Sequence, residues 1–137
     1  MLFANKQASI KNSYQGDFKK VLCVCSGGIL RSATAAVVLS QAPYNYNTRA
    51  AGLNKDLSLI AVDQFLLEWA DEIVCMEYWQ DTELCAMLKK YGLARKIIVL
   101  DIQSGSKYRD PVLVQAIKDK YDTEKGWLKK EGWLSLA

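Results

Sequence analysis

Histidine is absent from this chain of 137 residues, and its absence narrows the chemistry that the chain can perform. An imidazole ring is the usual general base beside a nucleophilic serine or cysteine, so catalysis of that kind is excluded. Any nucleophile in this chain must therefore be activated by another feature, such as the electric field of a loop or of a helix terminus.

Cysteine is scarce, and its spacing is unlike that of a metal site. Cys23 and Cys25 are separated by one residue, and Cys75 and Cys85 follow much later in the chain. Zinc fingers and ribbons place closely spaced ligand pairs at characteristic separations that this pattern does not match. We therefore expect no metal, and we expect Cys23, Cys75 and Cys85 to pack as core thiols.

Long apolar runs and long runs of one charge are also missing. No apolar segment is long enough to cross a membrane, and none follows Lys6 and Lys11 to form a signal peptide. The 18 Lys and Arg residues and the 15 Asp and Glu residues leave a net charge of only +3, without the basic block typical of nucleic-acid binding. We expect a cytoplasmic protein with reduced thiols that binds neither membranes nor nucleic acids.

The composition that remains is that of one globular domain. Half of the residues are hydrophobic, which suffices for a core without disulfides. We expect a polar N-terminal arm at 1–19, a domain at 20–122 and a tail at 123–137. The tail contains the sequence Gly-Trp-Leu twice, and we expect it to pack on the domain or on a partner.

Strand-like and helix-like segments alternate along the domain. Apolar, β-branched segments predict strands at 19–25, 44–52, 71–77 and 94–102, and helical spacing or helix signals predict helices at 31–41, 56–70, 78–92 and 111–121. Such alternation is typical of a parallel α/β sheet. Because ligands bind these sheets at the carboxyl ends of the strands, we expect Cys25, Gly52, residues 76–78 and the loop 102–110 to share one face.

The segment VCSGGILRSA (24–33) joins the first predicted strand to the first predicted helix. Backbone N–H groups at such a turn, together with the helix dipole, favour a bound anion. Gly27 and Gly28 allow backbone conformations in which the amides surround a tetrahedral oxyanion. The loop is therefore predicted to bind a phosphate-like group.

Three side chains in this loop predict nucleophilic chemistry on that group. The field of the loop stabilises a thiolate at Cys25, so histidine is not needed. The guanidinium of Arg31 can donate two N–H bonds to phosphoryl oxygens, and Ser32 is close enough to offer its hydroxyl to the sulfur. The alternative is a buried cysteine in a glycine-rich turn, with Arg31 merely solvated.

The loop resembles the C-x5-R-S signature of low-molecular-weight protein tyrosine phosphatases. The likeness continues in RAAGL (49–53), in LEWADEIVCME (67–77), and in ARKIIVLDI followed by YRDPVLVQAI, so that it covers roughly residues 20–120. The chain especially resembles the short predicted tyrosine phosphatases of bacteria and phages.

The resemblance implies a fold and an activity. The fold would be a single three-layer domain whose four-stranded parallel sheet is flanked by helices, with the phosphatase loop after the first strand. The activity would be cysteine-dependent hydrolysis of phosphate monoesters, most like that of a protein tyrosine phosphatase, through a phosphocysteine intermediate and without any cofactor. A phosphorylated protein or a small phosphate ester would be the substrate, and phosphate or sulfate would bind the loop.

The resemblance also implies roles for individual residues. Cys25 would be the nucleophile, Arg31 the phosphate clamp, Ser32 the partner of the thiolate and Asp110 the general acid. The phosphate would be bound by the loop residues Ser26, Gly27, Gly28, Ile29, Leu30 and Arg31.

Four positions depart from the pattern of that family. Gly28 stands where the family commonly has an asparagine that supports the loop, and Leu30 where a second cysteine often protects the nucleophile. Val112 and Leu113 follow the Asp-Pro pair where the family tends to have aromatic residues that line the substrate slot. A replacement wall could come from Tyr44, Tyr78 or Tyr108.

Three other interpretations stay open at this stage. Asp110 precedes Pro111 and could be only the N-cap of the last helix, in which case Asp101 is the alternative acid. A thiol-dependent arsenate reductase would use Cys75 or Cys85 in a disulfide relay with Cys25. A non-catalytic module that binds phosphate or phosphopeptides would need only the loop amides and Arg31.

Overall fold

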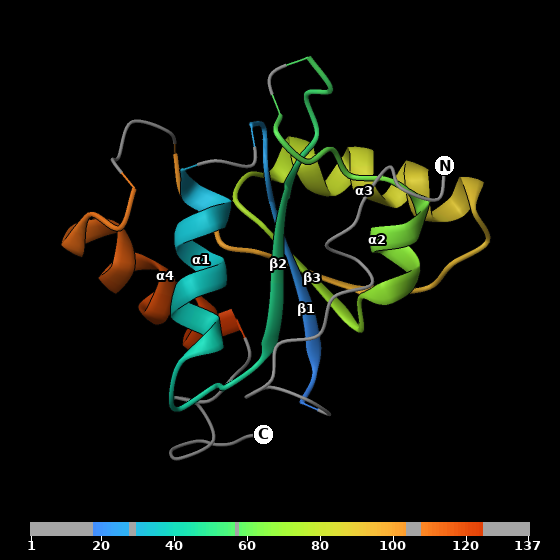
Figure 1. The fold of residues 1–137 in the computed structure, drawn as a ribbon. Coiled ribbons are helices and arrows are strands. Elements are labelled where there is room, and N and C mark those ends of the chain that lie inside the picture. Colours follow the sequence, from blue (N-terminus) through green and yellow to red (C-terminus); the bar gives the residue numbers. More distant parts are fainter. Residues whose placement is uncertain (1–17, 28–29, 57, 104–107, 125–137) are drawn as a thin grey trace.

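The computed structural model of this chain describes residues 18–27, 30–56, 58–103 and 108–124 (Figure 1). Strands and helices alternate strictly in the order β1 (Lys20–Cys25), α1 (Arg31–Ser40), β2 (Asn47–Gly52), α2 (Gln64–Trp69), β3 (Glu72–Cys75), α3 (Tyr78–Lys90), β4 (Lys96–Val99) and α4 (Pro111–Glu124). The predicted arm 1–19 and tail 123–137 lie mostly outside the described residues.

The four strands form one parallel sheet in the order β2-β1-β3-β4. This confirms the sheet that the sequence and the family resemblance predicted. Because β1 is central, its last residue, Cys25, lies beside Gly52 at the end of β2. Strand β3 flanks β1 on the other side, with Cys75 paired to Val24.

Helices cover both faces of the sheet, so the domain has three layers. Figure 1 shows α1 and α4 on one face and α2 and α3 on the other. Alternate residues of β1 serve the two cores, with Val21, Cys23 and Cys25 packing toward the first pair of helices and Leu22 and Val24 toward the second. A strand buried on both faces has no polar side, which explains its uninterrupted apolar sequence.

Helix α2 is much shorter than the sequence predicted. Helical spacing favoured a helix over 56–70, but the structure begins the helix at Gln64. The preceding residues run beside β2, where the N–H of Val62 donates to the carbonyl of Gly52 at 2.9 Å and Ala61 forms a bridge with the same glycine. Asp63 then caps the helix by accepting a bond from the N–H of Leu66 at 3.0 Å. Pairing with the sheet therefore prevailed over apolar periodicity.

Strand β2 also begins later than predicted, at Asn47 instead of residue 44. The N–H groups of Tyr44 and Asn45 both donate to the carbonyl of Gln41 at 3.0 Å, which makes a turn after α1. Asn45 has a positive φ of 55°, a conformation that asparagine tolerates better than most residues. This turn places Tyr44 at the amino end of the sheet.

A cluster of polar side chains closes that amino end. The buried carboxylate of Glu72 accepts bonds from Lys19 Nζ at 2.7 Å and from the hydroxyl of Tyr121 at 3.0 Å. Tyr44 donates its hydroxyl to Asp122 at 2.7 Å. These contacts attach α4 to the sheet and leave the carboxyl ends of the strands available for a site.

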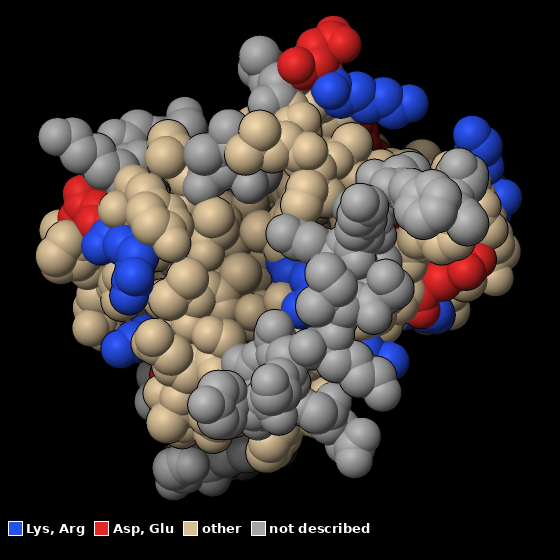
Figure 2. Space-filling model, in the orientation of Figure 1, with Lys and Arg blue, Asp and Glu red and all other residues tan. Residues whose placement is uncertain are grey.

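The exterior carries mixed charge. In the face shown in Figure 2, lysine, arginine and acidic side chains lie mainly around the margin, and uncharged residues occupy much of the area between them. None of the helices in the described ranges combines the length and the apolar character that crossing a bilayer requires.

Candidate active site

The predicted nucleophile ends β1 and faces the start of α1. The thiol of Cys25 is 3% exposed and donates to the hydroxyl oxygen of Ser32 at 3.2 Å. In the thiolate form the same hydroxyl can donate to the sulfur and stabilise its charge. The structure therefore brings together two of the residues predicted to act in the site. Gly28 and Ile29, predicted to bind phosphate, lie outside the described residues.

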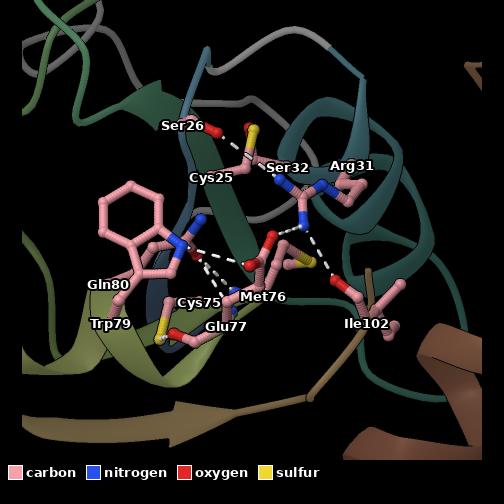
Figure 3. Close-up of polar contacts among 10 residues, drawn as sticks. All are labelled: Cys25, Ser26, Arg31, Ser32, Cys75, Met76, Glu77, Trp79, Gln80 and Ile102. Carbon is pink, nitrogen blue, oxygen red and sulfur yellow. Dashed lines mark hydrogen bonds and ion pairs between the residues drawn. The ribbon is translucent and has the colours of Figure 1, made fainter. Parts of the chain in front are cut away.

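Arg31 is buried and turned across the site (Figure 3). Its Nη1 donates to Glu77 Oε2 at 2.5 Å and to the carbonyl of Ile102 at 2.8 Å, and its Nη2 lies 3.5 Å from Ser26 Oγ. These contacts rule out the alternative in which Arg31 is merely solvated. One edge of the guanidinium is anchored to the loops after β3 and β4, and the other edge faces the phosphatase loop.

The loop after β2 is hydrogen-bonded to the backbone of the loop after β1. The N–H of Leu53 donates to the carbonyl of Cys25 at 3.0 Å, and the N–H of Asn54 donates to the carbonyl of Ser26 at 2.8 Å. A Cβ at Gly52 would lie 2.7 Å from that Ser26 oxygen and 2.6 Å from the carbonyl carbon of Gly27. The glycine of the RAAGL segment is therefore required by the close approach of two backbones.

Glu77 contributes to the site, although the sequence analysis did not single it out. It follows β3, and its backbone N–H is bound by the side chain of Gln80, whose Oε1 also accepts from the N–H of Met76 at 2.8 Å. Its carboxylate accepts bonds from Arg31 and from the indole of Trp79 (Figure 3). The spacing Glu-x-x-Gln after a predicted strand is the signal that could have found it, because it resembles the capping pattern of a helix start.

Asp110 caps the last helix. Its Oδ1 accepts a bond from the N–H of Val112 at 2.9 Å, as expected of an N-cap. The neighbouring Arg109 has a φ of 58°, and its N–H donates to Thr34 Oγ1 at 2.9 Å. Thr34 in turn donates to the carbonyl of Leu30 at 2.8 Å, so the segment before α4 is tied to the end of the phosphatase loop. The acid role of Asp110 remains a prediction.

Only two of the three tyrosines considered for the substrate slot lie near the carboxyl ends of the strands. The suggestion that Tyr44 lines the slot is wrong, because Tyr44 is buried at the opposite end of the sheet and donates a hydrogen bond to Asp122. Tyr78 begins α3 and Tyr108 precedes α4, and both are exposed. Trp79 is a further exposed aromatic residue on this side, and the sequence analysis did not consider it for the slot.

The other cysteines are not grouped around Cys25 as ligands or relay partners. Cys23 and Cys75 are buried core thiols, as predicted, and burial raises the pKa of Cys75 to about 12. Cys85 is exposed, so its predicted place in the core is wrong: Leu84 and Leu88 take the buried face of α3. Within the described ranges, no group of three acidic or cysteine side chains could hold a metal ion.

Comparison with solved structures identifies the fold. The tyrosine phosphatase Wzb from Escherichia coli K30, solved with phosphate, is 17% identical, with a TM-score of 0.59 over 84% of this chain and 99% of that one. Wzb from Vibrio vulnificus, solved with benzylphosphonate, is 20% identical, with the same TM-score over 82% and 99%. YfkJ from Bacillus subtilis is 19% identical, with a TM-score of 0.56 over 86% and 99%. No protein-family model and no curated protein matches the sequence. The chain therefore has the fold of the low-molecular-weight protein tyrosine phosphatases, as the resemblance implied.

Proposed function

We propose that this chain is a cysteine-dependent phosphomonoester hydrolase, most like a protein tyrosine phosphatase. The observation that carries the proposal is the arrangement of one loop: the sulfur of Cys25 lies 3.2 Å from the hydroxyl of Ser32, and the buried guanidinium of Arg31 faces the same loop. This arrangement supports roles for Cys25 as the nucleophile, for Ser32 as the group that stabilises its charge and for Arg31 as the clamp for phosphoryl oxygens, without histidine.

The proposed reaction has two displacements at phosphorus. The Cys25 thiolate attacks phosphorus in line with the ester oxygen, an S–P bond forms, the P–O bond breaks and Asp110 gives its proton to the leaving alcohol. Water then attacks the phosphocysteine, Asp110 takes a proton from that water, and the S–P bond breaks to restore the thiolate. Arg31 and the loop amides hold the equatorial oxygens and stabilise the charge that they carry in both transition states.

The names of the solved neighbours support a preference for phosphotyrosine. Wzb from Escherichia coli K30 and another solved neighbour are described as tyrosine phosphatases. Wzb from Vibrio vulnificus was solved with benzylphosphonate, which carries an aromatic group. A protein phosphotyrosine or another aryl phosphate is therefore the substrate that we propose, with inorganic phosphate as the product retained by the loop.

The first test replaces the nucleophile. We expect Cys25→Ser to lower hydrolysis of p-nitrophenyl phosphate by roughly a thousandfold or more, because the covalent route is lost. Cys85→Ser is the matched control, since that thiol is exposed on α3, and it should keep full activity. Turnover that persists in Cys25→Ser would contradict the proposal.

The second test separates the acid from the cap at Asp110. Asparagine caps helices about as well as aspartate but cannot donate a carboxyl proton, so Asp110→Asn should keep the stability of the fold. We expect its first step to slow by about 10²–10⁴-fold while vanadate binding is retained. The substrate is an alkyl phosphate, whose alcohol must be protonated as it leaves, and an unchanged rate of alcohol release from it would remove Asp110 from the mechanism.

Two further assays test the alternatives that the sequence left open. Thioredoxin-coupled turnover of arsenate would indicate the reductase. Binding of a phosphopeptide without any turnover, unaffected by Cys25→Ser, would indicate the binding module. Both outcomes would replace the proposed hydrolase.

A further inference from the structure

We propose that Trp79 forms an aromatic wall of the substrate slot and that Glu77 positions it against the Arg31 clamp. The inference rests on the proposed function for its substrate, a phosphate ester with an aromatic group, but its binding test is independent of turnover. In this proposal Trp79 provides the aromatic surface that Val112 and Leu113 do not supply.

One carboxylate joins the clamp to the indole. Glu77 Oε2 accepts from Arg31 Nη1 at 2.5 Å, and Glu77 Oε1 accepts from Trp79 Nε1 at 3.1 Å. Figure 3 shows the indole and the guanidinium on opposite sides of this carboxylate, with Cys25 and Ser26 above it in this view. The indole is thus held two hydrogen bonds from the group that clamps the phosphate.

The carboxylate itself is well fixed. The backbone N–H of Glu77 donates to Gln80 Oε1 at 3.1 Å, and Gln80 is fully buried. The side chain of Glu77 is 21% exposed and that of Arg31 is 6% exposed, so the ion pair is largely shielded from water. A shielded, charge-assisted pair of this kind orients its partners more firmly than a surface pair does.

The remaining surface of Trp79 is open to a ligand. The residue is 43% exposed although its polar atom is already bonded, so a large part of the indole has no protein cover. In an in-line reaction the leaving group points away from the attacking sulfur, toward the rim made by the loops after the strands. An aromatic leaving group there can stack on the indole or meet its edge.

The other exposed aromatic residues on this side lack such a connection. The backbone carbonyl of Tyr78 accepts a bond from the hydroxyl of Thr82, and Tyr108 lies beside the guanidinium of Arg109. Among the exposed aromatics of the described residues, Trp79 alone donates to a group that also contacts Arg31. Tyr78 is its neighbour in the chain and therefore a matched control.

The experiment measures binding of two phosphonates that the enzyme cannot hydrolyse. Affinities of benzylphosphonate and methylphosphonate are determined by titration calorimetry for the wild-type protein, Trp79→Leu, Trp79→Phe and Tyr78→Leu. We expect the wild type to prefer benzylphosphonate and Trp79→Leu to lose about five- to tenfold in affinity for it alone. Trp79→Phe keeps a ring and should retain most of the preference, and Tyr78→Leu should retain all of it.

The role of Glu77 is tested by the same ratio of affinities. Glu77→Ala releases the indole and should lower the preference for benzylphosphonate, whereas Glu77→Gln keeps an acceptor for the indole N–H and should restore it. If Glu77 only stabilised the fold, both variants would weaken the two phosphonates equally. That result would overturn its positioning role.

Several outcomes would overturn the wall itself. One is an equal loss of affinity for both phosphonates in Trp79→Leu. The others are a loss of the preference for benzylphosphonate in Tyr78→Leu and a wild-type protein that binds both phosphonates with the same affinity. Failure of the proposed function is separable from these. A protein that shows the Trp79-dependent preference but hydrolyses no phosphate ester keeps the wall and loses the activity.

Discussion

Gly52 is a single residue on which the shape of the phosphatase loop depends. It has no catalytic group, yet a Cβ there would meet backbone atoms of Ser26 and Gly27 at 2.7 and 2.6 Å. Backbone atoms cannot rotate away as a side chain can, so the loop itself would have to shift. The position of Cys25 relative to Ser32 depends on that loop.

We expect Gly52→Ala to destabilise the fold by about 1–3 kcal/mol, the usual cost of overpacking. Phosphate binding should weaken at the same time, because the displaced backbone belongs to the loop. Urea denaturation and phosphate titration provide the measurements. Gly27→Ala is the control for stability, since a Cβ at Gly27 would meet nothing within 4 Å. Equal stability of the two variants would contradict this account.

The proximity of side chains in this loop could be predicted at this scale because it is local. Cys25, Arg31 and Ser32 lie within one turn of the chain, and their chemistry follows from a strand, two glycines and a helix start. The local spacing Glu-x-x-Gln can indicate a helix start at Glu77, but it cannot predict the contact of Glu77 with Arg31, which lies 46 positions away in the sequence.

Helix α1 is the element that connects the loop after β1 with the segment before α4. Thr34 in its first turns is fully buried, donates to the carbonyl of Leu30 at the end of the phosphatase loop and accepts from the N–H of Arg109, next to Asp110. The hydroxyl is therefore a positioning group for the proposed general acid.

We expect Thr34→Val to lower turnover of an alkyl phosphate by about tenfold and that of p-nitrophenyl phosphate much less. A poor leaving group needs protonation and is sensitive to a displaced acid, whereas nitrophenolate leaves without it. Steady-state rates on both esters provide the measurement. Thr34→Ser keeps the hydroxyl and should behave like the wild type. The same loss on both esters would show that Thr34 supports only the fold.

Elements were predicted well where one signal dominated and poorly where two competed. All four strands and helices α1, α3 and α4 were found, although the predicted ranges of β2 and β4 were longer than the observed ones. Residues 58–62 were assigned to a helix because of their apolar spacing, but Ala61 and Val62 bond to Gly52 of β2. Periodicity within a short segment contains no information about a neighbouring strand edge.

The whole molecule keeps several ionisable groups protonated in its core. Burial raises the pKa of Cys75 to about 12, and burial also raises the pKa values of Cys23 and Tyr121. In the unfolded chain these thiols would ionise near their ordinary pKa of 9.0. The folded protein therefore binds more protons than the unfolded one above pH 9.

We expect the free energy of unfolding to be constant with respect to these thiols below about pH 9 and to fall above it, for Cys75 until about pH 12. Each buried thiol should contribute a loss of up to about 1.4 kcal/mol per pH unit. Urea denaturation between pH 8 and pH 11 measures the slope. Cys75→Val should make it shallower, and a stability that does not change over this range would contradict the prediction.

The order of strands and helices and the parallel sheet could be inferred from the chain alone, because the alternation of strand-like and helix-like segments is a local property of the sequence. The place of Cys25 at the end of a strand and of Arg31 at the start of a helix could be inferred for the same reason. The bond from Arg31 to Glu77, the contact of β2 with the loop at Gly52 and the place of Tyr44 at the far end of the sheet required the folded molecule. These features depend on which loops meet in space, and that is settled by the packing of the whole sheet and its helices.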